Sequence, residues 1–278
     1  MTLKEAITIK YPAYSEKLAE RFMEANGVEL AWENISKATL ARFCEYIQTI
    51  VARSTARFYC AAIKSTLSLY DDEHPLPNGW RDAMRVKKED SEQVYLSEDE
   101  IMKLMSYTPK NLNEEYSLTT FLLGCLTGAR HSDYVRFTEE NINEGFLRYT
   151  SQKTRTSACL PIAPAVPRLL KQMASLKNVE IADSTFNDCI RRICKNAGIT
   201  TSLKLYRRGK ETTAQKWEFI SSHTARRSFA SNLYLRGCDI LSISMMMGHA
   251  SVDMTRGYIV CGLREMPKSV TEYFTKFD

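Results

Sequence analysis

The sequence has no pair of cysteines at the C-x-x-C spacing, although it contains eight cysteines among 278 residues. They are scattered singly, and Cys189 and Cys194 have no histidine near them in the chain, so the pattern predicts free thiols and no metal site. No apolar run approaches the roughly 20 residues that cross a bilayer. The first residues, M-T-L-K-E-A-I-T, contain no apolar signal core, and we therefore expect a reducing, cytosolic compartment and no membrane partner.

The sequence also has no internal repeats and no low-complexity tracts. Its composition is that of an ordinary globular protein, 44% apolar and 26% charged, with enough chain for two hydrophobic cores. The net charge of +5 is unevenly distributed. Residues 1–90 hold 13 basic and 13 acidic residues, whereas the remainder holds 25 basic and 20 acidic ones. A modest excess of this kind is compatible with a polyanionic partner but does not establish one.

Residues 1–84 are predicted to form a helical domain. Ser36 can cap a helix whose apolar positions include Leu40, Phe43, Ile47 and Ile50. Further helices are predicted from Pro12 to about Ala25, ended by Gly27, and from a cap at Ser54 to about Tyr70.

Small and basic side chains share one face of the third of these helices. Arg57, Ala61, Lys64 and Ser68 recur at helical spacing, which suits a DNA groove or backbone, although a solvated face explains the pattern equally well. A turn-rich break follows, and then a charged stretch without apolar period. We interpret residues 85–94 as an interdomain linker whose Arg85, Lys87 and Lys88 follow the DNA backbone.

Residues 95–278 are predicted to form a second, α+β domain. Ser97 and Glu100 make a capping box ahead of a helix, and a helix from Glu114 to about Thr127 ends at Gly128. Short strands are predicted at 146–149 and 158–162 around a polar turn that holds Lys153, and at 203–205 and 217–220 around the basic loop of Arg207 and Arg208.

The most informative stretch runs from Ser222 to Tyr258. It predicts a helix over 224–235 with Ser222 as its cap, a second helix capped by Asp239 and stopped by Gly248, and a short third helix, capped by Ser251, that bears Tyr258. Arg226 continues the apolar stripe of the first of these helices. An arginine in that position is unusual, because a guanidinium is rarely buried without a partner, although an arginine lying over the core at a helix end is the simpler explanation.

Four motifs occur in an order and spacing that resemble the tyrosine recombinase (phage integrase) family. They are H-x-x-R at His223 and Arg226, G-H at His249 with Tyr258 nine residues later, T-G-A-R-H-S-D with Arg130 and Asp133, and Lys153 in its hairpin turn. Each motif is weak alone. The resemblance implies a mainly α fold with small β hairpins: a two-domain DNA clamp with a helical core-binding domain, an α+β catalytic domain, and a C-terminal segment, 264–278, that docks onto a neighbouring protomer.

The resemblance also implies the reaction. Such enzymes cut and rejoin DNA strands through a 3′-phosphotyrosyl intermediate without a metal or ATP. Their partners would be double-stranded DNA with inverted-repeat core sites, three further copies of the chain in a tetramer on two duplexes, and, in some cases, an accessory directionality factor. The biological role would be integration or excision of a phage or mobile element.

The residue types suit that chemistry. Arginine grips two phosphate oxygens at once, so Arg130 and Arg226 are the predicted clamp. The Tyr258 phenol is the predicted nucleophile and needs activation, because its ordinary pKa is near 10. His223 and His249 are predicted to bind the phosphate and assist proton movement, Lys153 to protonate the leaving 5′ oxygen, and Asp133 to orient Arg130 or a histidine.

Other readings remain open at this stage. A type IB topoisomerase uses nearly the same site, and a resolvase or invertase of the Xer type uses the same chemistry for another purpose. A non-catalytic DNA-binding regulator on the same fold is a third alternative, and a helical interaction module that does not bind DNA is a fourth.

Overall fold

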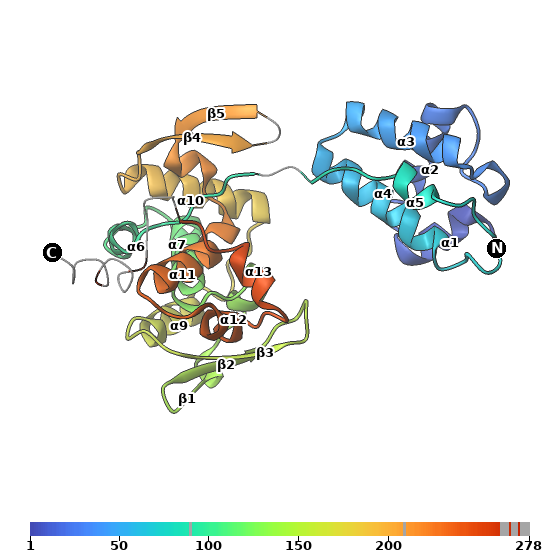
Figure 1. Cartoon of the computed structure of the whole chain (residues 1–278). Coiled ribbons are helices and arrows are strands. Elements are labelled where there is room, and N and C mark those ends of the chain that lie inside the picture. The colour runs from blue at the N-terminus through green and yellow to red at the C-terminus, as the bar shows by residue number, and fades with distance from the viewer. Residues whose placement is uncertain (89–90, 208–209, 262–266, 268–271, 273–278) are drawn as a thin grey trace. The chain divides into compact units, whose positions relative to one another are not determined.

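The computed structural model describes residues 1–88, 91–207, 210–261, 267 and 272. The chain forms two compact units, the first made of Met1–Ser91 with Tyr206–Glu211, and the second beginning at Glu92. The fold is mostly helical with small antiparallel sheets, as predicted (Figure 1). Residue 208 and most of the predicted docking segment 264–278 lie outside the described residues. Within the described part, no helix is both long and apolar enough to span a membrane.

The first unit is a bundle of helices around one core. Its elements are α1 (Leu3–Lys10), α2 (Ser15–Asn26), a 3₁₀ turn η1 (Trp32–Asn34), α3 (Lys37–Ile50), α4 (Arg53–Leu67) and α5 (Trp80–Ala83). Ser36 caps α3 through a capping box, and the left-handed Gly27 ends α2, both as the sequence predicts. Ile50, predicted to be buried, is 40% exposed, because α3 ends there and the next residue is already extended. Helix α1 was not predicted.

The second unit contains the remaining elements, apart from the adjoining ends of β4 and β5, which fall within Tyr206–Glu211. They are α6 (Glu98–Met105), α7 (Leu112–Thr127), α8 (His131–Tyr134), η2 (Glu139–Asn141), β1 (Ile142–Asn143), β2 (Phe146–Thr150), β3 (Ser157–Pro161), α9 (Val166–Ser175), α10 (Asp183–Asn196), β4 (Ser202–Arg207), β5 (Lys210–Gln215), η3 (Lys216–Phe219), α11 (Ser222–Leu235), α12 (Ile240–Met246) and α13 (Val252–Arg256).

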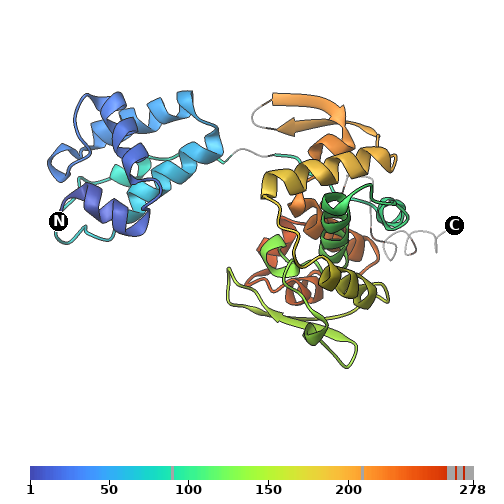
Figure 2. The same ribbon diagram turned by 180° about the vertical axis from the view of Figure 1, so that it is seen from behind.

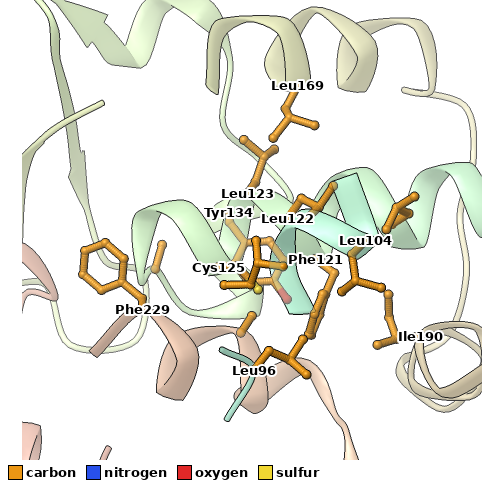
Figure 3. Close-up of a cluster of buried hydrophobic side chains, with 14 of the residues drawn as sticks. Leu96, Leu104, Phe121, Leu122, Leu123, Cys125, Tyr134, Leu169, Ile190 and Phe229 are labelled. Atoms are coloured by element: carbon orange, nitrogen blue, oxygen red, sulfur yellow. The ribbon is translucent and has the colours of Figure 1, made fainter. Parts of the chain in front are cut away.

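Helix α7 is the centre of the second unit, as Figure 1 and Figure 2 show. It is buried on nearly every side, because α6, α8, α9, α10 and α11 all pack against it. Figure 3 shows Phe121 pointing toward Leu96 and Leu123 pointing toward Leu169 of α9. An alanine at Gly124 would place its Cβ 2.5 Å from a ring carbon of Tyr134 and 3.0 Å from Cβ of Ala225, so glycine permits the close approach of α8 and α11. This packing sets the position of the N-terminal half of α11.

The first sheet is three-stranded, in the order β1-β2-β3, with both pairs antiparallel. Leu147 opposes Leu160 and Thr150 opposes Ser157, so the chain between β2 and β3 forms the turn that carries Lys153. Leu147, Tyr149, Ala158 and Leu160 are the buried positions of these alternating strands. Helix α12 packs against β3, which brings the turn beside the C-terminal elements (Figure 1).

Three local predictions in the second unit were wrong. Residues 217–220 do not form a strand: β4 pairs instead with β5, and Lys216–Phe219 is a 3₁₀ turn stabilised by a capping box between Gln215 and Glu218. The cap of α11 is Ser221, reciprocally bonded with Thr224, and Ser222 is already helical. Helix α13 ends at Arg256, so Tyr258 follows the helix and does not lie on it.

Candidate active site

Arg226 is the largest fully buried side chain in the described structure, only 1% exposed. It lies in the second turn of α11, on the side of the helix that packs against α7. The apolar stripe in the sequence therefore indicated its burial correctly. Burial lowers the pKa of the Arg226 guanidinium, and the nearby charge of Arg130 lowers it further. A guanidinium nevertheless stays protonated in proteins, so this charge requires local compensation.

The compensation comes from two helix ends. Nη1 of Arg226 donates to the carbonyl of Gly128, which ends α7, and Nη2 donates at 2.8 Å to the carbonyl of Met247, which ends α12. Both carbonyls lack a partner within their own helices, and a helix C-terminus carries partial negative charge. Among the described residues, no carboxylate pairs with Arg226: its polar neighbours are these two carbonyls, the imidazole of His249 and the phenol of Tyr149.

Gly128 makes the first of these contacts possible. Its φ of +64° is left-handed, and a Cβ at this position would lie 2.3 Å from Cδ1 of Phe229. A larger residue is therefore excluded both by the backbone conformation and by the ring of Phe229. Arg130 follows two residues later, as the N-cap residue of α8.

His249 connects Arg226 to α13. Its Nε2 lies 2.5 Å from Nη2 of Arg226, and its Nδ1 lies 2.8 Å from Oγ1 of the buried Thr255. Desolvation, followed by the charges of Arg226 and Arg130, lowers the pKa of His249 to about 4. The imidazole is thus neutral at neutral pH. Because the guanidinium can only donate, Nε2 accepts and Nδ1 carries the proton that it donates to Thr255.

Tyr258 lies against both of these side chains. The Cζ atom of Arg226 is 5.1 Å from the centre of the Tyr258 ring, within the range of a cation–π interaction. The rings of His249 and Tyr258 are stacked, with centroids 5.2 Å apart and an interplanar angle of 29°. The backbone N–H of Tyr258 donates to the carbonyl of Thr255 at 2.9 Å. One chain therefore brings the predicted nucleophile to one of the two predicted arginines.

Arg130 is held from the β2–β3 turn. Its Nη1 donates to Oγ of Ser151 at 3.0 Å and, over a longer distance of 3.4 Å, to Oγ1 of Thr154. Ser151 in turn donates to Oδ2 of Asp133 at 2.9 Å. Sequence reasoning predicted Asp133 beside Arg130 but did not identify Ser151, the side chain that joins them.

Lys153 and His223 lie at the exposed edge of this site. The pKa of His223 is lowered by desolvation and then by the charges of Arg227, Arg226 and Lys153. Lys153 is exposed in its turn, and its charge acts on His223. The turn is fixed to the rest of the site, because Oγ1 of Thr156 donates to the carbonyl of Gly248 at 2.8 Å.

Two further residues of this site were missed. Thr255 could not be recognised, because its role depends on contact with His249. Tyr149 of β2 is buried and its hydroxyl has no hydrogen-bond partner among the described residues. Burial raises the pKa of Tyr149 and the charge of Arg226 opposes that rise, so the two side chains are neighbours.

The five basic residues predicted to contact DNA from the first unit lie together. They line one hollow of about 850 Å³ between α4 and the chain after α5. The five residues are Arg57, Lys64, Arg85, Lys87 and Lys88. No acidic side chain lines this hollow within the described residues. Arg207, from the second predicted group, is the last residue of β4. The DNA-binding role of all these residues stays a prediction.

Comparison with known proteins identifies the family of this chain. The sequence profile of the phage integrase family matches residues 94–261, which is more than half of the chain. The chain therefore belongs to the phage integrase family. A proposed integrase of Pseudomonas phage Pf1 is 27% identical over 252 residues, which cover 88% of this chain and 68% of that protein. The tyrosine recombinase XerA of Pyrococcus furiosus is 28% identical over 177 residues, 63% of this chain and 60% of XerA.

Solved structures support the same fold. The integrase of transposon Tn1549, in complex with a circular intermediate DNA, superposes with a TM-score of 0.67 at 13% identity, over 99% of each chain. A lambda integrase dimer bound to a COC′ core site gives a TM-score of 0.65 at 16% identity, over 95% of this chain and 98% of that one. The matched regions span 60% of XerA and 48% of the integrase of Escherichia phage P2, so the chain spans about half of the length of some curated relatives.

Proposed function

We propose that this protein is a site-specific DNA recombinase that cuts and rejoins strands through a phosphotyrosyl bond at Tyr258. The single observation that carries this proposal is the contact of Tyr258 with Arg226 and His249 in one chain. The charge of Arg130 acts on both Arg226 and His249, so two guanidiniums that repel one another lie close together, and one of them, Arg226, lies against the Tyr258 ring. A phosphate between them relieves this repulsion and lies within reach of the hydroxyl.

The reaction is a transesterification in each direction. The phenol oxygen of Tyr258 attacks the phosphorus, the bond to the 5′ oxygen breaks, and the 5′ oxygen leaves as a hydroxyl after receiving a proton from Lys153. The proton of the phenol passes to His223, whose lowered pKa keeps its imidazole neutral and able to accept it. His249 has both nitrogens engaged by Arg226 and Thr255, so its role is to hold Arg226 and support the Tyr258 ring.

The substrate is double-stranded DNA with inverted-repeat core sites, bound by four copies of the chain on two duplexes in the bacterial cytosol. Support comes from the relatives, since the matched lambda integrase is a dimer on core-site DNA and another neighbour is a lambda integrase tetramer bound to a Holliday junction. The basic hollow of the first unit provides phosphate contacts at a distance from Tyr258 along the chain. The phage relatives favour integration or excision of a phage or mobile element as the biological role.

A suicide substrate tests the proposal. DNA taken from the regions flanking the gene is nicked near each candidate scissile bond, so that a short fragment diffuses away after cleavage and religation fails. The wild-type protein, in EDTA and without ATP, is expected to form a covalent protein–DNA adduct whose peptide map places the DNA on Tyr258. Tyr258→Phe should form none. An undiminished adduct in that variant refutes the proposal, and efficient relaxation of a plasmid without a specific site favours a topoisomerase instead.

A further inference from the structure

A buried carboxylate lies at the base of the turn that carries Lys153. Asp133 is 2% exposed; its Oδ2 accepts from Oγ of Ser151 at 2.9 Å, and its Oδ1 accepts from the backbone N–H of Gln152 at 3.0 Å. Both donors come from the two residues that follow β2. A carboxylate removed from water needs such donors. Asp133 therefore fixes where the chain leaves the strand.

This arrangement fixes the direction in which the Ser151 hydroxyl donates its single proton. A hydroxyl can donate once, and a carboxylate can only accept, so the proton of Ser151 points to Asp133. The lone pairs of the same oxygen then face Nη1 of Arg130, which donates at 3.0 Å. The side chain of Ser151 is 1% exposed, so water does not compete with either contact. The direction of both hydrogen bonds is thus fixed, and the carboxylate strengthens the acceptor that Arg130 meets.

We propose that Ser151 is the positioning residue that holds Arg130 in its phosphate-binding orientation, and that Asp133 acts on Arg130 through Ser151. This inference rests on the proposed function. No hydrogen bond or ion pair joins the side chains of Asp133 and Arg130 in the described residues, whereas the Ser151 hydroxyl bonds to both side chains. The other contact of Arg130, to Thr154, is longer and exposed. Without Ser151, the long side chain of Arg130 regains rotamers that do not face the phosphate.

An alternative is that Ser151 positions Lys153, two residues later in the same turn. Modified substrates separate an effect on Arg130 from an effect on Lys153. A methylphosphonate at the scissile position lacks the negative oxygen that Arg130 would neutralise. A 5′-bridging phosphorothiolate has a thiolate leaving group, which departs without the proton that Lys153 would supply. A defect transmitted through Arg130 should shrink on the first substrate and persist on the second, whereas one transmitted through Lys153 should show the opposite pattern.

The experiment measures single-turnover cleavage and, separately, DNA affinity for the full chain. Ser151→Ala is expected to cleave the ordinary phosphodiester roughly 10- to 100-fold more slowly at similar DNA affinity. Ser151→Thr, which keeps a hydroxyl, should retain most of the rate. Ser151→Cys preserves the volume with a weak hydrogen-bonding group and replaces the alanine variant if that one fails to fold. Thr150→Ala is the matched control, because Thr150 is exposed on β2 and bonds to Ser157.

Asp133→Asn is combined with Ser151→Ala to test whether Asp133 acts on Arg130 through Ser151. If Asp133 acts through Ser151, the double variant should be no slower than the slower single variant. Additive losses overturn that part of the inference, and equal losses on all three substrates indicate a structural role and overturn the whole of it. Wild-type rates in both Ser151→Ala and Ser151→Cys also overturn it. A wild-type protein that forms no adduct with any substrate instead refutes the proposed function.

Discussion

Replacement of Arg226 by lysine tests whether the fork of the guanidinium, rather than its charge, joins the elements of the site. In the wild-type protein, Nη1 bonds to the carbonyl of Gly128 while Nη2 bonds to the carbonyl of Met247 and lies beside Nε2 of His249. A lysine keeps the positive charge but carries all its donors on one nitrogen. It therefore cannot donate to the carbonyls at the ends of both α7 and α12 in the same geometry.

The expected loss of stability follows from the acceptors left behind. A buried carbonyl without a partner costs about 1–3 kcal/mol, so Arg226→Lys should lower the free energy of unfolding by that amount. Arg226→Ala removes the hydrogen-bond donor of both carbonyls and of the imidazole and also leaves a cavity. We therefore expect the free energy of unfolding to fall by about 3–5 kcal/mol. Many domains are stable by only about 5–15 kcal/mol, which makes the lysine variant the more informative of the two.

Urea denaturation and single-turnover cleavage measure the two consequences separately. Cleavage by Arg226→Lys should fall by about 10²–10³-fold, the usual effect of removing a preorganised donor. Arg236→Lys is the control at the other end of α11, where the guanidinium pairs with Glu98 at the surface, and it should change stability by no more than about 1 kcal/mol. Wild-type stability in Arg226→Lys, or an equal loss in Arg236→Lys, would show that the two carbonyl contacts do not stabilise the fold.

Three further predictions concern pH, DNA affinity and backbone conformation. The pKa of His249 is lowered to about 4 in the folded chain from an ordinary 6.5, so the unfolded chain takes up the proton first as pH falls. The contribution of His249 to the free energy of unfolding is therefore complete above pH 6.5 and is lost as pH falls toward 4. The urea midpoints of wild type and His249→Gln should converge over that window. Replacing Arg57 and Lys64 by glutamine should reduce the slope of log K against log[salt] by about 2 in binding titrations, unless the hollow does not contact DNA. Gly128→Ala should cost more than about 1 kcal/mol in the same urea assay, because its Cβ meets Phe229; an unchanged midpoint contradicts this.

The helices could be predicted where the sequence marks their ends. Ser36 and Ser97 cap helices through capping boxes, and Gly27 and Gly128 adopt the left-handed conformation at helix ends, as the local pattern indicates. The second hairpin was predicted wrongly, because the apolar residues at 217–220 suggested a strand. The actual strand β5, K-E-T-T-A-Q, is almost entirely polar, since none of its residues is fully buried.

The candidate site was predictable to the extent that its residues lie in short motifs. The motifs identified side chains that the structure brings within range of one another, but their roles stay predictions. Ser151 and Thr255 carry no signal of their own, because serine and threonine are common and each acts through a partner far away in the sequence. The pairing of Asp133 with Ser151 depends on the register of β2, which the sequence does not determine.

The partners of Arg226 explain why a buried arginine can serve a catalytic purpose. A carboxylate would neutralise the guanidinium fully and compete with the phosphate. The ends of α7 and α12 instead offer carbonyls, each helix end carrying at most about half an elementary negative charge. Gly128 and Gly248 stop these helices, and Arg130 and His249 follow them within two residues. The turns that end α7 and α12 thus supply both the carbonyls that bind Arg226 and the side chains that share its site. Because these carbonyls neutralise the guanidinium only in part, Arg226 still attracts an anion.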